Sequence, residues 1–426
     1  MKPLFINIFF TTFSINNTKN LIYSIKDQLK TFPNNDCFVI INTIYNNNET
    51  EFEKLGKLIG FSNFQINLIS QSEITLLEIK YQDFISEANC NINVSSIQRG
   101  RIQQQIYIKE HYSKFQNTII WQVDDDMLFK SFEIISNQII MNNDIDYFGK
   151  LISVYSKKGN EIDALVAKSN YTPPIPSLLY TLNQLTDILK NEYKSAPIEQ
   201  NEDYHDYYFS SLKNGYYNIK LHEEENTNTL IKRILNGQPI TRPVLHKQLT
   251  EMSDEPFFIR GGNFIVFNTE LFLTVPHLGF VFNKEEPARR SDMLHASLAL
   301  DLGYKIIENH ELILVHNRCF EEYSFEKNIH DYYNDLIGNI ILIRLHKSIE
   351  EVNERIDFHK RHLDDIILLF EEYNLKSDYK KEFKLLQDLK QLVDQLKWVD
   401  IEPKYNEFLE KYKNIRKRED ICKLLS

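Results

Sequence analysis

Short apolar runs alternate with amphipathic segments over the first part of the chain. Residues 4–10, 36–43 and 64–69 are apolar and rich in β-branched and aromatic side chains, which predicts buried strands. Between them, apolar residues recur at helical spacing near residues 16–29 and 49–59. The β-α-β-α-β order predicts an α/β fold, with a mostly parallel sheet and helices on both faces.

Apolar runs and amphipathic segments continue to alternate through the middle of the chain. A long helix is predicted over residues 95–112, with Ile97, Ile102 and Ile106 on its apolar stripe, and a strand over 118–123 follows it. The later elements predicted, in order, are a helix near 130–141, a strand over 146–154, a helix near 178–190, a strand after Gly261-Gly262, a helix capped by Ser291 or Asp292 that ends at Gly303, and two short strands over 305–307 and 312–316.

The pattern changes at about residue 325, after which no strand signal remains. Apolar residues follow helical spacing from Leu342 to Phe370 without a break, a second stripe runs from Leu385 to Leu396, and a third helix is predicted over 403–416. We therefore expect a C-terminal helical bundle that could join copies of the chain. The expected units are residues 1–155, an insertion over 156–255, residues 256–322, which complete the α/β part, and a helical region over 323–426.

Composition narrows the class of protein. The chain has 426 residues, 42% of them apolar, and a net charge of −11, which argues against nucleic acid as a partner. Its four cysteines lie far apart, which indicates a reducing compartment. No apolar stretch approaches the length of a membrane span, and the first apolar run is interrupted by Asn7 and lacks a signal-peptide cleavage site. We expect a cytoplasmic protein.

Three adjacent carboxylates, Asp124-Asp125-Asp126, end the apolar run 118–123. Like charges this close repel one another, and a bound divalent cation relieves the repulsion. If extended geometry persists, Asp124 and Asp126 lie on one side and Asp125 on the other. Mg²⁺ and Mn²⁺ prefer carboxylate and phosphate oxygens, so the outer pair predicts a metal site that would bridge to a diphosphate. A solvated acidic turn is the alternative interpretation.

The stretch Trp121 to Met127, with an arginine-bearing helix before it and a Gly-Gly strand and an acid-bearing helix after it, resembles the D-x-D motif of nucleotide-sugar-dependent glycosyltransferases of the GT-A fold. The resemblance covers about residues 4–320. It implies that residues 1–155 are the donor-binding half, that 156–255 are an acceptor-side insertion and that 256–322 complete the catalytic domain. It implies that Asp124 contacts the donor or metal, that Asp126 ligates Mn²⁺ or Mg²⁺, and that Asp125 is the variable middle residue on the donor side. It also implies that His316 is a further metal ligand; a buried, hydrogen-bonded histidine is the alternative.

The resemblance further implies roles for three other segments. Thr11, Arg99 and Arg101 match the donor-facing region, although solvated arginines are an equally simple interpretation. The segment Gly261-Gly262-Asn263 matches an acceptor-side loop. Asp292 matches the acid that serves as catalytic base in inverting members, whereas an acid in a helix's first turn is also favourable on its own.

These features and the resemblance predict a metal-dependent glycosyltransferase that moves a sugar from a nucleotide-diphosphate sugar to a hydroxyl of a glycan or other acceptor. Because members of the family it resembles commonly act in surface glycan synthesis, we expect the same of this protein. Two alternatives remain. A nucleotidyltransferase would carry a glycine-rich basic loop after the first strand, where this chain has Thr11 to Asn16. A non-catalytic scaffold built on a transferase domain, with the helical tail for assembly, would not need the intact acid triplet.

Overall fold

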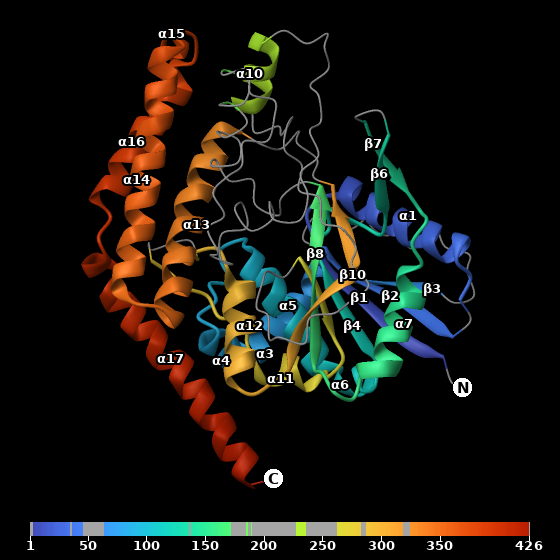
Figure 1. Ribbon diagram of the computed structural model, residues 1–426. Helices are drawn as coiled ribbons and strands as arrows, with labels where there is room; N and C mark the ends of the chain where they lie inside the picture. The colour runs from blue at the N-terminus through green and yellow to red at the C-terminus, as the bar shows by residue number, and fades with distance from the viewer. Residues whose placement is uncertain are drawn as a thin grey trace.

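The structure, a computed structural model, describes residues 3–34, 36–45, 64–135, 138–171, 185, 189, 227–235, 262–282, 287–317 and 324–425. Within these ranges the protein is a mixed α/β fold with a helical C-terminal region (Figure 1). Among the described residues, no helix combines the length and the apolar character needed to cross a membrane.

An eight-stranded sheet lies at the centre of the α/β part, in the order β3-β2-β1-β4-β9-β8-β10-β5. Its strands are β1 (Leu4–Thr12), β2 (Cys37–Tyr45), β3 (Phe64–Ile69), β4 (Ile119–Val123), β5 (Met127–Leu128), β8 (Ala164–Tyr171), β9 (Asn263–Val266) and β10 (Ile306–His316). β3, β2, β1 and β4 are parallel, as are β8 and β10, whereas β9 is antiparallel to β4 and β8. The carboxyl ends of β1, β4, β8 and β10 therefore meet at one edge of the sheet, where α/β proteins bind ligands.

Helices cover both faces of this sheet and bury a separate hydrophobic core on each. In β1, Ile6, Ile8 and Phe10 point into the core shared with α1 and α7, whereas Phe9 points into the core shared with α3, α5, α11 and α12. This alternation is what a strand covered on both faces requires. The helices before the C-terminal region are α1 (Ile15–Thr31), α3 (Gln71–Lys80), α4 (Gln82–Glu87), α5 (Ile97–Glu110), α6 (Tyr112–Phe115), α7 (Tyr147–Lys158), α10 (Thr227–Leu235), α11 (Glu270–Thr274) and α12 (Ser291–Asp301).

The C-terminal region is helical, as the sequence predicts. It consists of α13 (Phe325–His346), α14 (Ile349–Glu372), α15 (Leu375–Asp378), α16 (Lys380–Gln395) and α17 (Trp398–Leu425). These helices stack beside α12, on the side away from α1 and α7 (Figure 1). Their apolar residues belong to the same hydrophobic core as α5 and α12, and Phe280 contacts Phe408 at a centroid distance of 5.9 Å. The region is therefore packed onto the α/β part through a continuous core.

Two predicted elements after the acid triplet are wrong. The helix expected near 130–141 is a hairpin of β6 (Ser131–Ile135) and β7 (Gln138–Asn142), in which Ser131 lies opposite Asn142 and Ile135 lies opposite Gln138. The strand expected over 146–154 is the helix α7. Its buried residues Tyr147, Phe148, Leu151 and Val154 share one helical face, and the Asp146 carboxylate caps it by accepting from the Gly149 N–H at 2.8 Å.

Three further predictions need correction. The two short strands at 305–307 and 312–316 are one strand, β10, whose register shifts between Asn309 and Leu314. The seam from Leu342 to Phe370 is interrupted by the start of α14, where Ser348 and Glu351 form a capping box. Ile97 is 52% exposed and does not join the buried stripe of α5, although Ile102 and Ile106 do. The helix predicted near 49–59 lies outside the described residues, as does all of the one near 178–190 except positions 185 and 189.

Candidate metal centre and active site

Strand register brings two of the three acids to the end of β10. The chain turns after β4, and β5 pairs antiparallel with β10 so that Met127 lies opposite His316. Asp126 precedes Met127, and its Oδ1 lies 3.0 Å from His316 Nε2. A ligand atom from each of Asp124, Asp126 and His316 falls within 4.8 Å of the other two. Residues 190 positions apart in the chain therefore converge because the two strand ends are hydrogen-bonded neighbours.

This trio could hold a metal ion. Two carboxylate oxygens and one imidazole nitrogen form a donor set for a divalent metal ion, with further coordination positions left open. The His316 side chain is fully buried, so its ring is fixed in place. Asp126 Oδ1 and His316 Nε2 lie 3.0 Å apart, a separation at which both atoms can bind one cation. The donor set therefore fits a divalent cation without rearranging the strands.

The middle acid, Asp125, points elsewhere. Its Oδ2 accepts a hydrogen bond of 2.5 Å from the Thr12 hydroxyl at the end of β1. Burial, followed by the neighbouring charge of Asp126, raises the pKa of Asp125 to about 8. The carboxylate of Asp125 is directed to Thr12 and does not converge with Asp124 and Asp126. The alternation expected from the sequence is consistent with this division of the triplet.

Gly262 allows Asp124 to sit at the edge of the sheet. The Asp124 N–H donates to the Gly262 carbonyl at 3.2 Å, and a Cβ on Gly262 would come within 2.7 Å of Asp124 Oδ2. Gly261 lies outside the described residues. Asn263 is buried: its Oδ1 accepts from Trp121 Nε1 at 2.7 Å, and its Nδ2 donates to the Leu312 carbonyl at 2.8 Å. Its side chain thus connects β9 to β4 and to β10.

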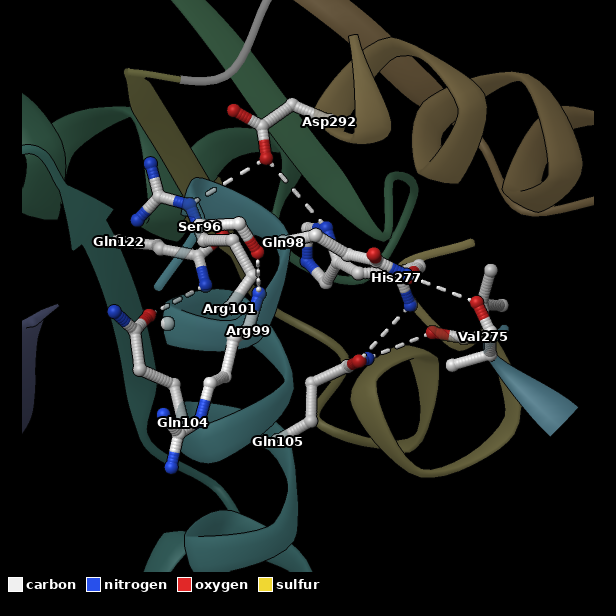
Figure 2. A network of polar contacts seen from close by, with 12 residues as sticks. Ser96, Gln98, Arg99, Arg101, Gln104, Gln105, Gln122, Val275, His277 and Asp292 are labelled. Carbon is white, nitrogen blue, oxygen red and sulfur yellow. Dashed lines mark hydrogen bonds and ion pairs between the residues drawn. The ribbon is translucent and has the colours of Figure 1, made fainter. Parts of the chain in front are cut away.

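The two arginines of α5 have separate environments. Arg99 makes a bidentate pair with Glu78, with distances of 2.9 and 3.0 Å. Arg101 is buried, and Figure 2 shows it beneath Asp292. Its guanidinium donates to Asp124 Oδ1 at 2.6 Å and to the Val123 carbonyl at 3.3 Å, and its Nε lies 3.4 Å from Asp292 Oδ1. Arg101 therefore connects the metal candidate to the base candidate, a role that the sequence does not reveal.

Asp292 lies in the first turn of α12 and lines the cavity described below. The N-cap of this helix is Arg290, without a side-chain cap, so the expectation that Ser291 or Asp292 caps it is wrong. The carboxylate directs one oxygen toward Arg101 and His277, and the other points away from both (Figure 2). His277 Nδ1 is 3.5 Å from Asp292 Oδ1. Burial holds the pKa of His277 well below its ordinary value, so this contact joins a neutral imidazole to a carboxylate rather than forming an ion pair.

A cavity of about 450 Å³ lies at the carboxyl edge of the sheet. The acid triplet, Arg101 and Asp292 line it, so the metal candidate and the base candidate face one space. Thr11 also lines it: its hydroxyl donates to the Gly100 carbonyl and accepts from Gln104 Nε2, each at 3.1 Å. The volume lies within the range of small-molecule sites. Arg99, which pairs with Glu78, is not among the described lining residues.

Sequence reasoning missed the polar, buried face of α5. Its glutamines reach distant backbone and side-chain groups: Gln98 donates to the His277 carbonyl at 3.0 Å, Gln105 accepts from the His277 N–H at 3.0 Å, and Gln104 accepts from Gln122 at 2.6 Å. Figure 2 shows these contacts around α5. The run Gln103-Gln104-Gln105 was the available signal, because polar residues on a buried helix must find partners. His277 had no local signal.

Comparisons with known proteins add little to this site. No protein-family model matches the chain, and no curated protein matches it. Among solved structures, the chain matches mouse xyloside xylosyltransferase 1 in its apo form, with 11% sequence identity and a TM-score of 0.26. The match covers 47% of this chain and 63% of that chain, which is less than two thirds of its length. Similarity at this level does not define a shared fold, so the function is argued from the site.

Proposed function

We propose that this protein is a metal-dependent glycosyltransferase with a GT-A-like catalytic domain, and that it transfers a sugar from a nucleotide-diphosphate sugar to a hydroxyl acceptor. One observation carries the proposal: Asp124, Asp126 and His316 converge at a cavity that Asp292 also lines. A cation-holding trio and a separate carboxylate facing one space are the two parts that sugar transfer from a diphosphate needs.

The proposed division of labour follows from these positions. A divalent cation held by Asp124, Asp126 and His316 would neutralise charge on the departing diphosphate. Arg101 keeps the Asp124 carboxylate in place through a 2.6 Å hydrogen bond. Thr11, near the end of β1, and Asp125, in the middle of the acid triplet, line the same cavity and would lie beside the donor. The part of the chain before residue 155 would hold the donor, and residues 256–322 would complete the site.

Asp292 is the proposed base. The acceptor hydroxyl oxygen forms a bond to the anomeric carbon, the bond from that carbon to the diphosphate oxygen breaks, and Asp292 receives the hydroxyl proton. Arg101 beside its Oδ1 favours the ionised carboxylate, which can accept a proton. A base on the face opposite the leaving group implies inversion at the anomeric carbon, which NMR of the product would report.

The test is a panel of nucleotide sugars, each incubated with the full chain and Mn²⁺ or with EDTA. We expect at least one donor to be hydrolysed or transferred in Mn²⁺, to raise the melting temperature, and to lose both effects in EDTA. In Asp126→Asn, we expect the activity and the melting-temperature shift seen with Mn²⁺ to be lost. If no donor is consumed and none shifts the melting temperature, the protein is not a transferase of this kind, and the scaffold alternative gains support.

A further inference from the structure

Two consecutive arginines fasten the start of α12 to α13. Arg290 is buried, and its guanidinium donates to Asp335 Oδ2 at 2.8 Å. Arg289 lies 3.1 Å from Asp331 Oδ2. Both side chains pair with carboxylates of one helix, α13. The pairs therefore connect the residues just before Asp292 to the C-terminal region.

The backbone of the same segment is also held by α13. The Arg289 N–H donates to the Asn334 carbonyl at 3.2 Å. A Cβ on Gly338 would come within 2.0 Å of the Arg289 carbonyl oxygen and 2.9 Å of its carbon. Only a residue without a side chain permits the helix to approach this closely, so Gly338 sets the distance between α13 and the segment before α12.

Arg290 needs this support because its backbone is strained. Its φ of 84° lies in the left-handed region, which a side chain other than glycine rarely adopts. It is the N-cap of α12, it has no side-chain cap, and its guanidinium also contacts Met293 Sδ at 3.7 Å. The direction in which α12 leaves this residue decides where Asp292, two positions later, points its carboxylate.

The helix α13 also forms part of the cavity wall. Lys327, Asp331 and Asn334 line the same cavity as Asp292 and the acid triplet. The apolar residues Leu336 and Ile340 of α13 share one hydrophobic core with Met293 of α12. The helix is thus joined to the candidate active site through ion pairs, a backbone contact and a continuous core.

We infer that α13 is a positioning element of the candidate active site, in which Asp335 and Gly338 hold Arg290 in its left-handed conformation and so fix Asp292 over Arg101. The catalytic consequence rests on the proposed function, whereas the positioning itself does not. The C-terminal helices are then part of the catalytic unit and not a detachable assembly tail.

The structural test is hydrogen–deuterium exchange of the full chain, followed in peptides that cover residues 288–301. In Asp335→Asn and Gly338→Ala, we expect these amides to exchange at least about tenfold faster, because the first turn of α12 loses its support. Alanine normally stabilises a helix relative to glycine, so a loosening effect of Gly338→Ala points to the contact with Arg289. Glu326→Gln is the matched control, since it removes an exposed 3.1 Å ion pair of α13 with Lys381.

Unchanged exchange over 288–301 in Asp335→Asn would overturn the inference, whatever Gly338→Ala does. If Gly338→Ala does not fold, Asp335→Asn decides alone. The functional readout is the split between kcat and KM: both variants should lower kcat at least about tenfold and keep the donor KM within about twofold. If Asp335→Asn exchanges faster over 288–301 but the wild-type chain has no transferase activity, the proposed function is rejected and the positioning role stands.

Discussion

The two ends of the cavity are assembled in different ways. At the acid end, Asp126 and His316 meet because β5 and β10 are paired, and strand register alone sets their 3.0 Å contact. At the other end, Asp292 is placed by Arg101 of α5, by His277 and by the anchoring of Arg290 on α13. The acid end therefore depends on the pairing of two strands, whereas the Asp292 end depends on packing between helices.

The largest expected effect lies at the Asp292 end of the cavity, the packed end. Asp292→Asn should lower turnover by a factor of about 10² to 10⁴, the range for loss of a general base, because the amide cannot accept the proton. Mn²⁺ affinity should hold, since Asp292 is outside the metal trio. Steady-state kinetics with a matched Mn²⁺ titration separates the two quantities. Unchanged turnover would remove Asp292 from the mechanism and leave the acid end intact.

A pH-dependent loss of stability is the next prediction. Burial lowers the pKa of His295, which stacks on His277 at a centroid distance of 3.9 Å, to about 4. Between pH 6.5 and 4 the unfolded chain binds this proton and the folded protein does not, so the free energy of unfolding falls as the pH falls. The contribution is about 3 kcal/mol at 1.36 kcal/mol per pKa unit.

Urea unfolding from pH 7 to pH 4 measures this loss. His295→Phe keeps a ring beside Phe272 and removes the titration, so its stability should fall less steeply with decreasing pH. Equal slopes for wild type and variant would show that His295 has the same pKa in the folded and the unfolded protein, which would contradict this prediction.

Arg101 touches both ends and tests whether they are coupled. Arg101→Lys keeps the charge but cannot donate to Asp124 and Val123 while lying beside Asp292. We expect metal affinity and turnover to fall about 10- to 100-fold together. The matched change Arg99→Lys disrupts the pair with Glu78 and should leave metal affinity unaltered. If only one of the two quantities falls in Arg101→Lys, the ends act independently.

Gly262→Ala is the mildest of these changes and acts on the acid end alone. The added methyl group would lie 2.7 Å from Asp124 Oδ2, and overpacking of this kind costs about 1–3 kcal/mol. Metal affinity should fall about tenfold, read by Mn²⁺ titration, whereas exchange over residues 288–301 should match wild type. An equal effect at both ends would contradict the separation between them.

The strands and the acid pair of the acid end could be predicted from the sequence, whereas some neighbouring elements could not. The apolar run before Asp124 predicts a strand, and alternation along it predicts that Asp124 and Asp126 lie on one side. The role of His316 as a third metal ligand was implied only by the resemblance to glycosyltransferases. The hairpin after Lys130 and the helix α7 were interchanged, because short apolar runs suit either structure until the tertiary packing decides.

The packed end could not be predicted. Gln98 and His277 are 179 positions apart, and their hydrogen bond follows from how α5 lies against the segment after α11. The left-handed conformation of Arg290 and the need for glycine at position 338 arise only when α13 is docked. Such features depend on long-range packing, which leaves no periodic signal in the chain.

The most direct test of the central claim is a Mn²⁺ titration of the full chain, followed by calorimetry or by the electron paramagnetic resonance of free Mn²⁺. We predict one site in the wild-type protein and a loss of at least about 100-fold in affinity for Asp126→Asn, because a ligand contributes more than its supporting residues. Asp125→Asn, whose carboxylate bonds to Thr12, should lose less. Equal affinity in wild type and Asp126→Asn, or no binding by either, would contradict the metal centre on which the proposed function rests.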